Sequence, residues 1–464
     1  MQTARWLAPI TVMLTTLCLL GLTGIAQTPA PSPAVAVTTP VSEIARNEET
    51  GKTQAPAVKA SPTPEPDFWH RETITGDWGG DRTRLKERGV ALEFKLSNFY
   101  QGTADGGVRE VSVYNGKFSA EAKFDLGKLA HWNWWSAEVK TETRFGGPLL
   151  PGVGAINPTN TTAIVPTSSG TVTAVTALNV TKLFPLDLKK GDLIAVSFGR
   201  FNLLDLVDED FFGGQGIDKF FNVAQIGPLT VAREVPIITN LVSFAYVKGG
   251  EPFFTFAVMD PNDHSTTTGL PDLFADGVTF SPGINFPAKY FGKTAKHSIA
   301  ANVTTKKFTP FDEIRQLIIP GPSTTVVESR RGSWSVIYTF RQFIVERGKR
   351  DGWGFFTQIS AANPDTSPIT KFVNLGLGGN GLFKQRRYDE FGIAYAYTDL
   401  SRQLKDNLDP LNRRRLRPEH QIEIFYNLHI TPWMRFTGDL QIIRPTRPIA
   451  TTAIVPGVRL EFIF

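Results

Sequence analysis

Apolar and polar side chains alternate strictly along much of this chain, and few folds accommodate such a pattern. The segments Val90–Leu96, Phe118–Leu126 and Trp135–Phe145 are the clearest examples. In the first of them, Glu93 and Lys95 each stand between two apolar residues. Because successive side chains of a β-strand leave opposite faces of a sheet, a period of two predicts strands with one apolar and one polar face.

Further candidate strands follow as far as the last residue of the sequence. They are residues 172–181, 193–201, 241–247, 253–259, 298–304, 333–341, 355–361, 372–377, 390–398, 421–427, 436–442 and 458–464. In the last of them, Arg459 and Glu461 stand between apolar residues, and the segment ends at Phe464. The chain is therefore expected to be an all-β protein.

A soluble β-sandwich and a membrane-spanning β-barrel both use alternating strands, but three features favour the barrel. The polar faces carry long side chains of both charges, as a water-filled lumen requires. Long connections rich in Pro, Thr and Gly, such as residues 146–171 and 260–287, alternate with short ones. Aromatic residues cluster at predicted strand ends, where a barrel needs interface girdles. These aromatic residues are Trp132–Trp135, Phe211, Phe212, Tyr426 and Trp433.

The N-terminal residues 1–26 have the layout of a secretory signal peptide, with Arg5 ahead of the apolar stretch Trp6–Leu22. A retained transmembrane anchor is the alternative for this segment. The single cysteine, Cys18, lies inside it, so the mature chain has no thiol for a disulfide or a metal. Residues 27–66 are rich in Pro, Ala, Thr and Val and predict a disordered periplasmic linker ahead of a barrel domain at 67–464.

The rest of the composition excludes other classes of protein. Beyond residue 26, no window of about twenty residues is apolar throughout, which excludes helical membrane spans. The formal net charge of +5 is too small to indicate a nucleic-acid partner. Residues Gly79–Gly89 predict a short N-terminal periplasmic helix with Asp81 as its N-cap and Gly89 as its stop.

Four segments resemble the OprB family of carbohydrate-selective porins. They are Ile74–Val90, Asp272–Ser281, Asn374–Leu382 and Glu423–Ile443. The resemblance covers about residues 68–464 and implies a sixteen-stranded antiparallel barrel in the outer membrane of a Gram-negative bacterium, through which mono- and oligosaccharides diffuse passively. For such a barrel, we expect contact with outer-membrane lipid and recognition of the last strand, which ends at Phe464, by the barrel-assembly machinery.

Charged side chains on the predicted inward faces are the candidates for contact with sugar. They are Glu93, Lys95, Glu121, Lys123, Glu138, Lys140, Glu142, Arg144, Arg341 and Glu423. A sugar hydroxyl that exchanges water for such a group gains about 1 kcal/mol net, so passage stays fast and weakly selective. Each of these charges can equally be solvated without touching sugar, and the family motifs mark strands and turns rather than sugar contacts.

The sequence predicts no catalytic residue, metal site or cofactor. Asp260, Asn262 and Asp263 lack the glycine and distal glutamate of a calcium loop. The arginine run 413–417 is interpreted as a basic loop near lipid phosphate or sugar. Two alternatives to a porin remain open, namely a plugged barrel that anchors the envelope and a hydrolase with its site at the barrel rim, although no nucleophile motif is found.

Overall fold

The computed structural model describes residues 66–168, 170–207, 210–311, 329–412 and 416–464. The expected signal peptide and almost all of the expected linker lie outside the described residues. The strands are β1 (Val90–Gly102), β2 (Asp105–Gly107), β3 (Ser112–Asp125), β4 (Trp135–Gly146), β5 (Val172–Asp187), β6 (Asp192–Asn202), β7 (Ile238–Lys248), β8 (Glu251–Met259), β9 (Thr279–Tyr290), β10 (Lys293–Phe308), β11 (Arg330–Gly348), β12 (Asp351–Ala362), β13 (Ile369–Asn380), β14 (Glu390–Leu400), β15 (Glu419–Thr431), β16 (Met434–Arg444) and β17 (Thr451–Ile463).

The helices are short and lie between strands or ahead of them. They are η2 (Trp78–Gly80), α3 (Asp81–Glu87), α4 (Leu126–Ala130), α5 (Leu150–Val153), η3 (Thr161–Ala163), η4 (Leu203–Leu206), η5 (Gly214–Gly216), α6 (Val223–Ile226), η6 (Leu229–Val231) and α8 (Arg402–Asn412). None of the helices in the described ranges is long and apolar enough to cross a membrane.

Sixteen long strands, β1 and β3 to β17, form one closed antiparallel barrel, which confirms the predicted fold. Each strand pairs with the next along the chain, and β1 closes the ring by pairing with both β3 and β17. The three-residue strand β2 pairs only with the end of β17. Closure leaves no unpaired edge strand, which is the condition for a sheet to cross a bilayer.

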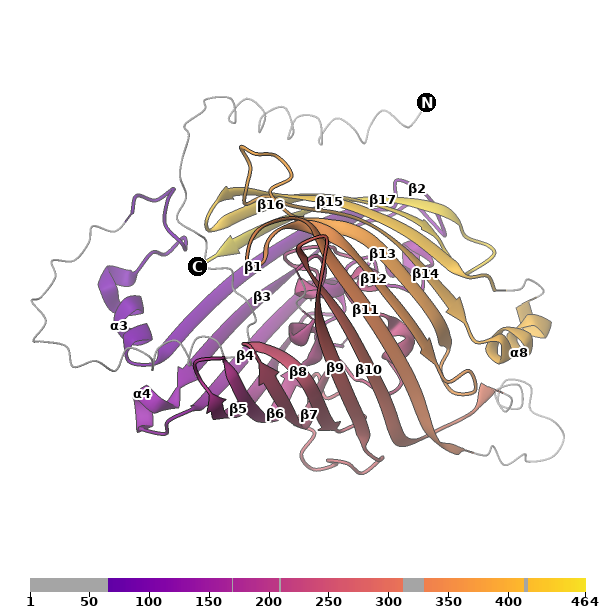
Figure 1. The fold of residues 1–464 in the computed structure, drawn as a ribbon. Helices are drawn as coiled ribbons and strands as arrows, with labels where there is room; N and C mark the ends of the chain where they lie inside the picture. Colours follow the sequence, from indigo (N-terminus) through magenta and orange to yellow (C-terminus); the bar gives the residue numbers. More distant parts are fainter. Residues whose placement is uncertain (1–65, 169, 208–209, 312–328, 413–415) are drawn as a thin grey trace, which may run out of the picture. The chain divides into compact units, whose positions relative to one another are not determined.

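The two ends of the barrel differ in the length of their connections. At the short-turn end, pairs such as β7–β8, β9–β10 and β11–β12 are joined by only two residues between strands. At the long-loop end, residues 147–171 connect β4 to β5, and residues 203–237 connect β6 to β7. In Figure 1, α3 and α4 lie at one end of the barrel and α8 lies at the other. Outer-membrane barrels carry short turns on the periplasmic side and long loops outside the cell.

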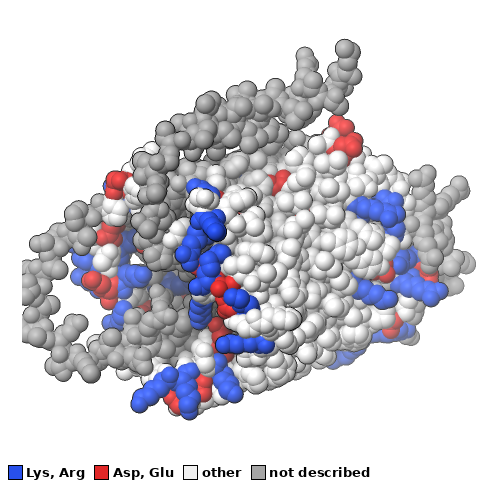
Figure 2. Space-filling model, turned by 45° about the horizontal axis from the view of Figure 1, so that its top comes forward, with Lys and Arg blue, Asp and Glu red and all other residues white. Residues whose placement is uncertain are grey.

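The outward face of the barrel is apolar over its middle. Large apolar side chains at alternate strand positions remain exposed, for example Leu178 at 56%, Val303 at 49% and Ile359 at 48%. Figure 2 shows a wide uncharged area between two groups of charged side chains. A surface of this kind is costly in water and is matched by the hydrocarbon of a membrane.

One predicted connection is wrong in its extent, because β9 begins at Thr279 and occupies the last part of residues 260–287. Two prolines, Pro282 and Pro287, argue against a strand in the sequence, since proline cannot donate to a ladder. In the barrel, the register of β9 with β10 passes from Gly283 to Phe280, so this ladder skips Pro282, which lies opposite Phe256 of β8 instead. Pro287 lies opposite Lys296 of β10. Phe280 and Phe286 remain exposed on the outward face, as in the neighbouring strands.

The predicted N-terminal helix is present as α3, but its cap differs from the prediction. Gly80, in a left-handed conformation, occupies the N-cap position, and Asp81 is the first helical residue. Asp77 takes the capping role instead, because its carboxylate accepts hydrogen bonds from the Thr83 backbone N–H and hydroxyl, both at 2.9 Å. The helix ends before Gly89, whose φ of +99° fits the predicted stop.

The segment that contains α3 packs on the seam where the barrel closes. Trp433, in the β15–β16 turn, lies 4.9 Å from the ring of Phe68, and its indole N–H donates to the Phe68 carbonyl at 2.9 Å. Arg82 stacks on Trp78 at 4.6 Å and donates to the main-chain oxygen of Phe464 at 2.6 Å. The N-terminal motif therefore fastens the last strand to the start of the barrel.

We expect Trp433→Ala to lower the temperature at which the barrel loses its compact migration in a denaturing gel. Trp433 is only 4% exposed, and truncation of a buried Trp costs about 3–5 kcal/mol. Trp132→Ala is the matched control, because Trp132 is 61% exposed. Equal melting temperatures for the two variants would show that the seam contacts add nothing to stability.

Candidate functional site: the lumen of the barrel

Two connections from the long-loop end fold into the barrel and narrow its lumen. We call residues 147–168 the first inner segment and residues 203–207 with 210–237 the second inner segment. Asn157 of the first donates to Thr398 on β14 at 3.0 Å, and Phe221 of the second contacts Phe99 on β1 at 5.3 Å between ring centroids. Because these partners are inward residues on widely separated strands, both segments lie inside the ring.

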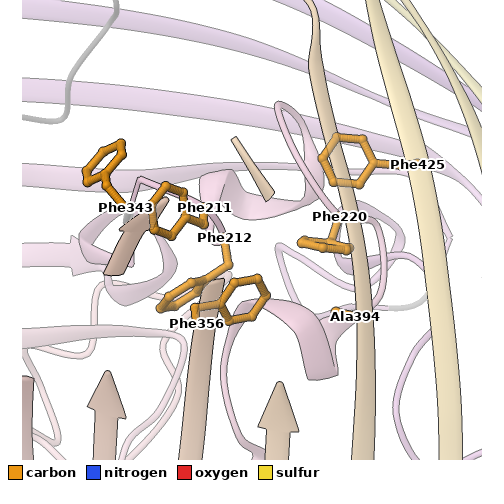
Figure 3. Packing of buried hydrophobic residues seen from close by; sticks show 7 residues of the cluster. All are labelled: Phe211, Phe212, Phe220, Phe343, Phe356, Ala394 and Phe425. Atoms are coloured by element: carbon orange, nitrogen blue, oxygen red, sulfur yellow. The ribbon is translucent and has the colours of Figure 1, made fainter. Parts of the chain in front are cut away.

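A phenylalanine core fixes the second inner segment against the wall. Figure 3 shows the rings of Phe211, Phe212 and Phe220 among side chains from the strands. The strand residues of this cluster are Phe343, Phe356, Ala394 and Phe425. Phe211 and Phe212 are 0% and 1% exposed, so their predicted place in an interface girdle is wrong. The sequence pattern of aromatic residues near a strand end is compatible with an interface girdle and with burial inside the lumen, and Phe211 and Phe212 are buried inside the lumen.

Charged wall residues also hold the second inner segment. The carboxylate of Glu423 accepts hydrogen bonds from the backbone N–H groups of Phe221 and Asn222. Arg459 donates to the Gly216 and Lys219 carbonyls, both at 3.0 Å, and its guanidinium lies 4.7 Å from the Phe221 ring. Glu423 and Arg459 are each 1% exposed. They are thus structural anchors of the inner segment as well as parts of the wall.

Comparable anchors hold the first inner segment. Arg144 on β4 donates to the carbonyls of Ala163, Pro166 and Ser168 at 3.0, 3.1 and 2.6 Å. Glu419 on β15 accepts from the Asn157 backbone N–H at 3.1 Å and from its side-chain amide at 2.7 Å. These bonds satisfy backbone groups that would otherwise be buried without partners.

A four-residue charged cluster joins β3 and β4 to the second inner segment. Glu142, which is 0% exposed, lies 3.2 Å from Lys117 and 3.8 Å from Lys140. Lys140 in turn contacts the carboxylate of Asp205 at 2.9 Å. Burial raises the pKa of Asp205 to about 7, since the nearby Lys140 offsets only part of the cost of an ionised carboxylate there.

The raised pKa of Asp205 predicts a change of ion selectivity near neutral pH. As the pH falls through about 7, Asp205 gains a proton, so the cluster gains one positive charge. We expect the permeability of K⁺ relative to Cl⁻ to fall between about pH 8 and about pH 6, measured as a reversal potential in a salt gradient. Asp205→Asn should remove this step, and a step that persists in the variant would assign it to another group.

The open part of the lumen is lined by charges near the short-turn end. We call Glu93, Lys95, Asp218, Arg435 and Glu461 the charged ring. Lys95 contacts Glu93 at 2.8 Å, and Arg435 contacts Asp218 at 2.8 Å and Glu461 at 3.4 Å. Burial alone would raise the pKa of Asp218, but the surrounding Lys95, Arg435, Lys219 and Arg459 hold it at about 2. Glu461 is 1% exposed, whereas Glu93 and Asp218 are 28% and 34% exposed and Lys95 and Arg435 are 14% and 15% exposed, so these four side chains are the part of the ring that faces the lumen.

The ten predicted residues separate into two groups in the structure. Lys140, Arg144, Arg341 and Glu423 contact the inner segments, and the partner of Arg341 is Asp210. Glu142 is buried beside them but bonds residues of the wall, namely Lys117 on β3 and Asn202 at the end of β6. Glu93, Lys95, Glu121, Lys123 and Glu138 face the lumen near the short-turn end, where Lys123 contacts Glu121 at 2.6 Å and Asn179 donates to Glu138 at 3.1 Å. Exposure of the second group reaches 45% at Lys123 and 28% at Glu93.

Several charged residues of the lumen are not among the candidates for contact with sugar that were predicted from the sequence. Arg435, Arg459 and Glu461 occupy the inward positions of β16 and β17, which the alternation of the last strands reveals. Asp205 and Asp218 come from the second inner segment, where no period marks the inward side.

The residues Asp260, Asn262 and Asp263 organise a loop. Asp260 is buried, and its carboxylate accepts from the backbone N–H groups of Asn262 at 2.8 Å and Phe274 at 2.6 Å. Within the described residues, no group of three His, Cys, Asp or Glu side chains is arranged to hold a metal ion.

Comparison with known proteins places this barrel among porins. The family model of the carbohydrate-selective porins, OprB family, matches residues 109–464. Porin B of Pseudomonas aeruginosa is 22% identical over 431 residues, which is 84% of this chain and 91% of that protein. The putative porin QuiX of Acinetobacter baylyi is 31% identical over 87 residues, which is 18% of this chain and 20% of that protein. A structure of Pseudomonas putida OprB at high pH superimposes with a TM-score of 0.72 and 19% identity, covering 85% of this chain and 99% of that one.

Proposed function

The chain belongs to the OprB family of carbohydrate-selective porins, and we propose that its charged ring is the place where diffusing sugars contact the pore wall. The protein is an outer-membrane porin of a Gram-negative bacterium, through which small carbohydrates diffuse passively into the periplasm. The observation that carries the proposal is the set of paired charges left facing the lumen after the two inner segments have filled the rest.

The mechanism is an exchange of hydrogen bonds and requires no chemical step. A sugar that enters the narrowed lumen loses water from its hydroxyl groups and contacts carboxylate oxygens and ammonium or guanidinium hydrogens instead. Each exchange changes the free energy by only about 1 kcal/mol, so the solute binds briefly and leaves. Because Lys95 and Arg435 are each paired with carboxylates, the ring offers polar groups without a large net field.

Among the predicted residues, Glu93, Lys95, Glu121, Lys123 and Glu138 are our candidates for direct contact with sugar. Lys140, Arg144, Arg341 and Glu423 are proposed to act on the pore indirectly, because each holds an inner segment in place. Glu142 is proposed to act indirectly as well, because it lies beside Lys140, which binds Asp205 of the second inner segment. The known relatives are channels, and we propose that this chain likewise has no enzymatic activity.

The remaining expectations concern partners and processing. We propose that residues 1–26 are a cleaved signal peptide, that 27–66 form a periplasmic linker, and that 67–464 form the barrel domain. Contact with outer-membrane lipid is supported by the apolar outward face. Recognition by the barrel-assembly machinery is supported by the last strand, β17, whose outward residues Leu460 and Phe462 precede Phe464.

Reconstitution of the purified full chain in a planar bilayer tests the proposed function. We expect stable open conductance that an added monosaccharide or short oligosaccharide partly blocks. Rates of liposome swelling should fall steeply as the sugar becomes longer, since the inner segments leave a narrow path.

The same preparation separates the alternatives. A correctly folded barrel that conducts no current would favour a plugged anchor. Release of hydrolysis products from an oligosaccharide would favour an enzyme at the rim. Conductance that is insensitive to sugar would keep the pore and overturn the role of the charged ring.

A further inference from the structure

A hollow of about 640 Å³ lies in the outer wall of the barrel, away from the lumen. Its lining includes Tyr290, Lys293, His297, Tyr338 and Gln342, with aromatic walls. We call it the outer hollow. We propose that the outer hollow binds one glycerophospholipid of the leaflet that faces the periplasm, with an acyl chain along the aromatic wall and the phosphate near Lys293.

The strand register places the hollow on the outward face. His297 lies opposite Phe340 in the pairing of β10 with β11. On β10 it is an even number of residues from Ile299 and Val303, so it shares their face of the sheet, and these two residues are 43% and 49% exposed. On β11, Tyr338 and Gln342 are on the same face as Trp334, which is 42% exposed. The hollow therefore opens toward lipid.

The outer hollow lies near the end of the barrel, at the level of the lipid headgroups. Tyr290 and Lys293 flank the β9–β10 turn at the short-turn end, and Phe291 in that turn is fully exposed. Short turns lie on the periplasmic side of outer-membrane barrels, where headgroups meet water. An aromatic and basic turn at this depth is placed to contact a phosphate above and hydrocarbon below.

A hydrogen-bond relay in the hollow has a donor left over. The Tyr290 hydroxyl lies 2.9 Å from Nε2 of His297, and the Tyr338 hydroxyl lies 2.7 Å from Nδ1. Two phenols and one neutral imidazole supply three donor hydrogens for these two bonds. Among the described residues neither phenol has another polar partner, so one of the two O–H groups is left without an acceptor.

Two further groups in the hollow also lack hydrogen-bond partners in the described part of the chain. The amide nitrogen of Gln342 donates to the carbonyls of Phe343 at 2.9 Å and Tyr290 at 3.3 Å, while its buried oxygen has no hydrogen bond. Among the described residues, no carboxylate lies within ion-pair distance of Lys293, although Lys293 interacts electrostatically with Glu346, which is bonded to Thr294. Unsatisfied polar groups are costly at the edge of the hydrocarbon.

A phospholipid supplies what the phenol and Lys293 lack. Its phosphate and ester oxygens accept from the phenol and from Lys293, and its acyl chain fills the space between Phe340 and Phe355. The Gln342 oxygen needs a donor, which these lipid oxygens do not provide, so it takes no part in the proposed binding. A second copy of this chain would have to bring an acceptor on its own outward face, which is mainly apolar along the described strands.

Binding of phosphatidylglycerol and phosphatidylethanolamine to delipidated full chain, counted by native mass spectrometry, tests the proposal. We expect one tightly held phospholipid on the parent chain. Tyr338→Phe and Lys293→Ala should each weaken its retention by roughly tenfold, since each removes a hydrogen bond to a charged or ester oxygen. Compact migration in a gel would verify that the variants fold.

Tyr395→Phe is the matched control. Tyr395 also faces outward and bonds a histidine, His420, at 2.8 Å, but outside the outer hollow. Its lipid binding should equal that of the parent chain. Equal retention by all variants would overturn the proposal, and so would a lipid-free oligomer that Tyr338→Phe dissociates, because the hollow would then hold a second copy.

Discussion

Replacement of Arg459 by alanine is expected to raise the single-channel conductance severalfold and to abolish block by sugar. Arg459 donates to two carbonyls of the second inner segment and to the Thr437 hydroxyl at 2.8 Å. Each hydrogen bond of a charged donor contributes about 1.5–3 kcal/mol, so their loss is large enough to release the segment locally. The lumen would then widen where the segment had filled it.

Arg347→Ala is the matched control for this variant. Arg347 on β11 also makes several bonds, to the Asn380 carbonyl at 2.7 Å and to Asp351 at 3.0 Å, but none to an inner segment. Its conductance in a planar bilayer should equal that of the parent chain. An unchanged conductance in folded Arg459→Ala would mean that the phenylalanine core alone fixes the second inner segment.

The sequence predicts the wall of the barrel well and its filling poorly, for a physical reason. Residues of strands such as β1 and β4 alternate in polarity because one face of the strand meets hydrocarbon and the other meets water. The polarity of each single residue therefore indicates its face. The inner segments are packed on all sides by protein, so they have no such contrast. Nothing in their sequence distinguishes Phe211 and Phe212 from residues of an interface girdle.

The inner segments also disturb the alternation of the wall that holds them. Phe425 is inward and 3% exposed, between the inward residues Glu423 and Asn427. It is apolar on a polar face because it packs against Phe220, at 4.7 Å between ring centroids. An apolar residue at an inward position is thus a sequence sign of a segment inside the lumen.

The candidate site shows the same limit. The alternation of apolar and polar residues predicts that Glu142 and Glu423 face inward, and both do. The alternation does not distinguish a side chain that faces open lumen from one that is buried. That distinction depends on which wall residues the inner segments cover. Lys117 escapes prediction because β3 begins at Ser112, where Asn115 and Gly116 obscure the period.

The double substitution Lys95→Gln and Arg435→Gln is expected to make the pore strongly cation-selective and to weaken sugar block. Both side chains keep much of their length and their hydrogen-bond donors, but the charged ring loses two positive charges. Glu93 then lacks its partner Lys95, and Asp218 and Glu461 lack Arg435, while Arg459 stays near both of the latter. Since about 1.4 kcal/mol changes a ratio tenfold, we expect the permeability of K⁺ relative to Cl⁻ to rise at least about tenfold.

Lys349→Gln separates this local effect from a change in overall charge. Lys349 is 67% exposed and pairs with Glu251 at 3.4 Å, between the β11–β12 and β7–β8 turns at the short-turn end. Exposed pairs are screened by salt, so this variant should leave the reversal potential near that of the parent chain. If the double variant shifts the potential but sugar still blocks it fully, the charged ring sets ion selectivity while sugars bind elsewhere along the lumen. If neither changes, the path for solutes does not pass Lys95 and Arg435.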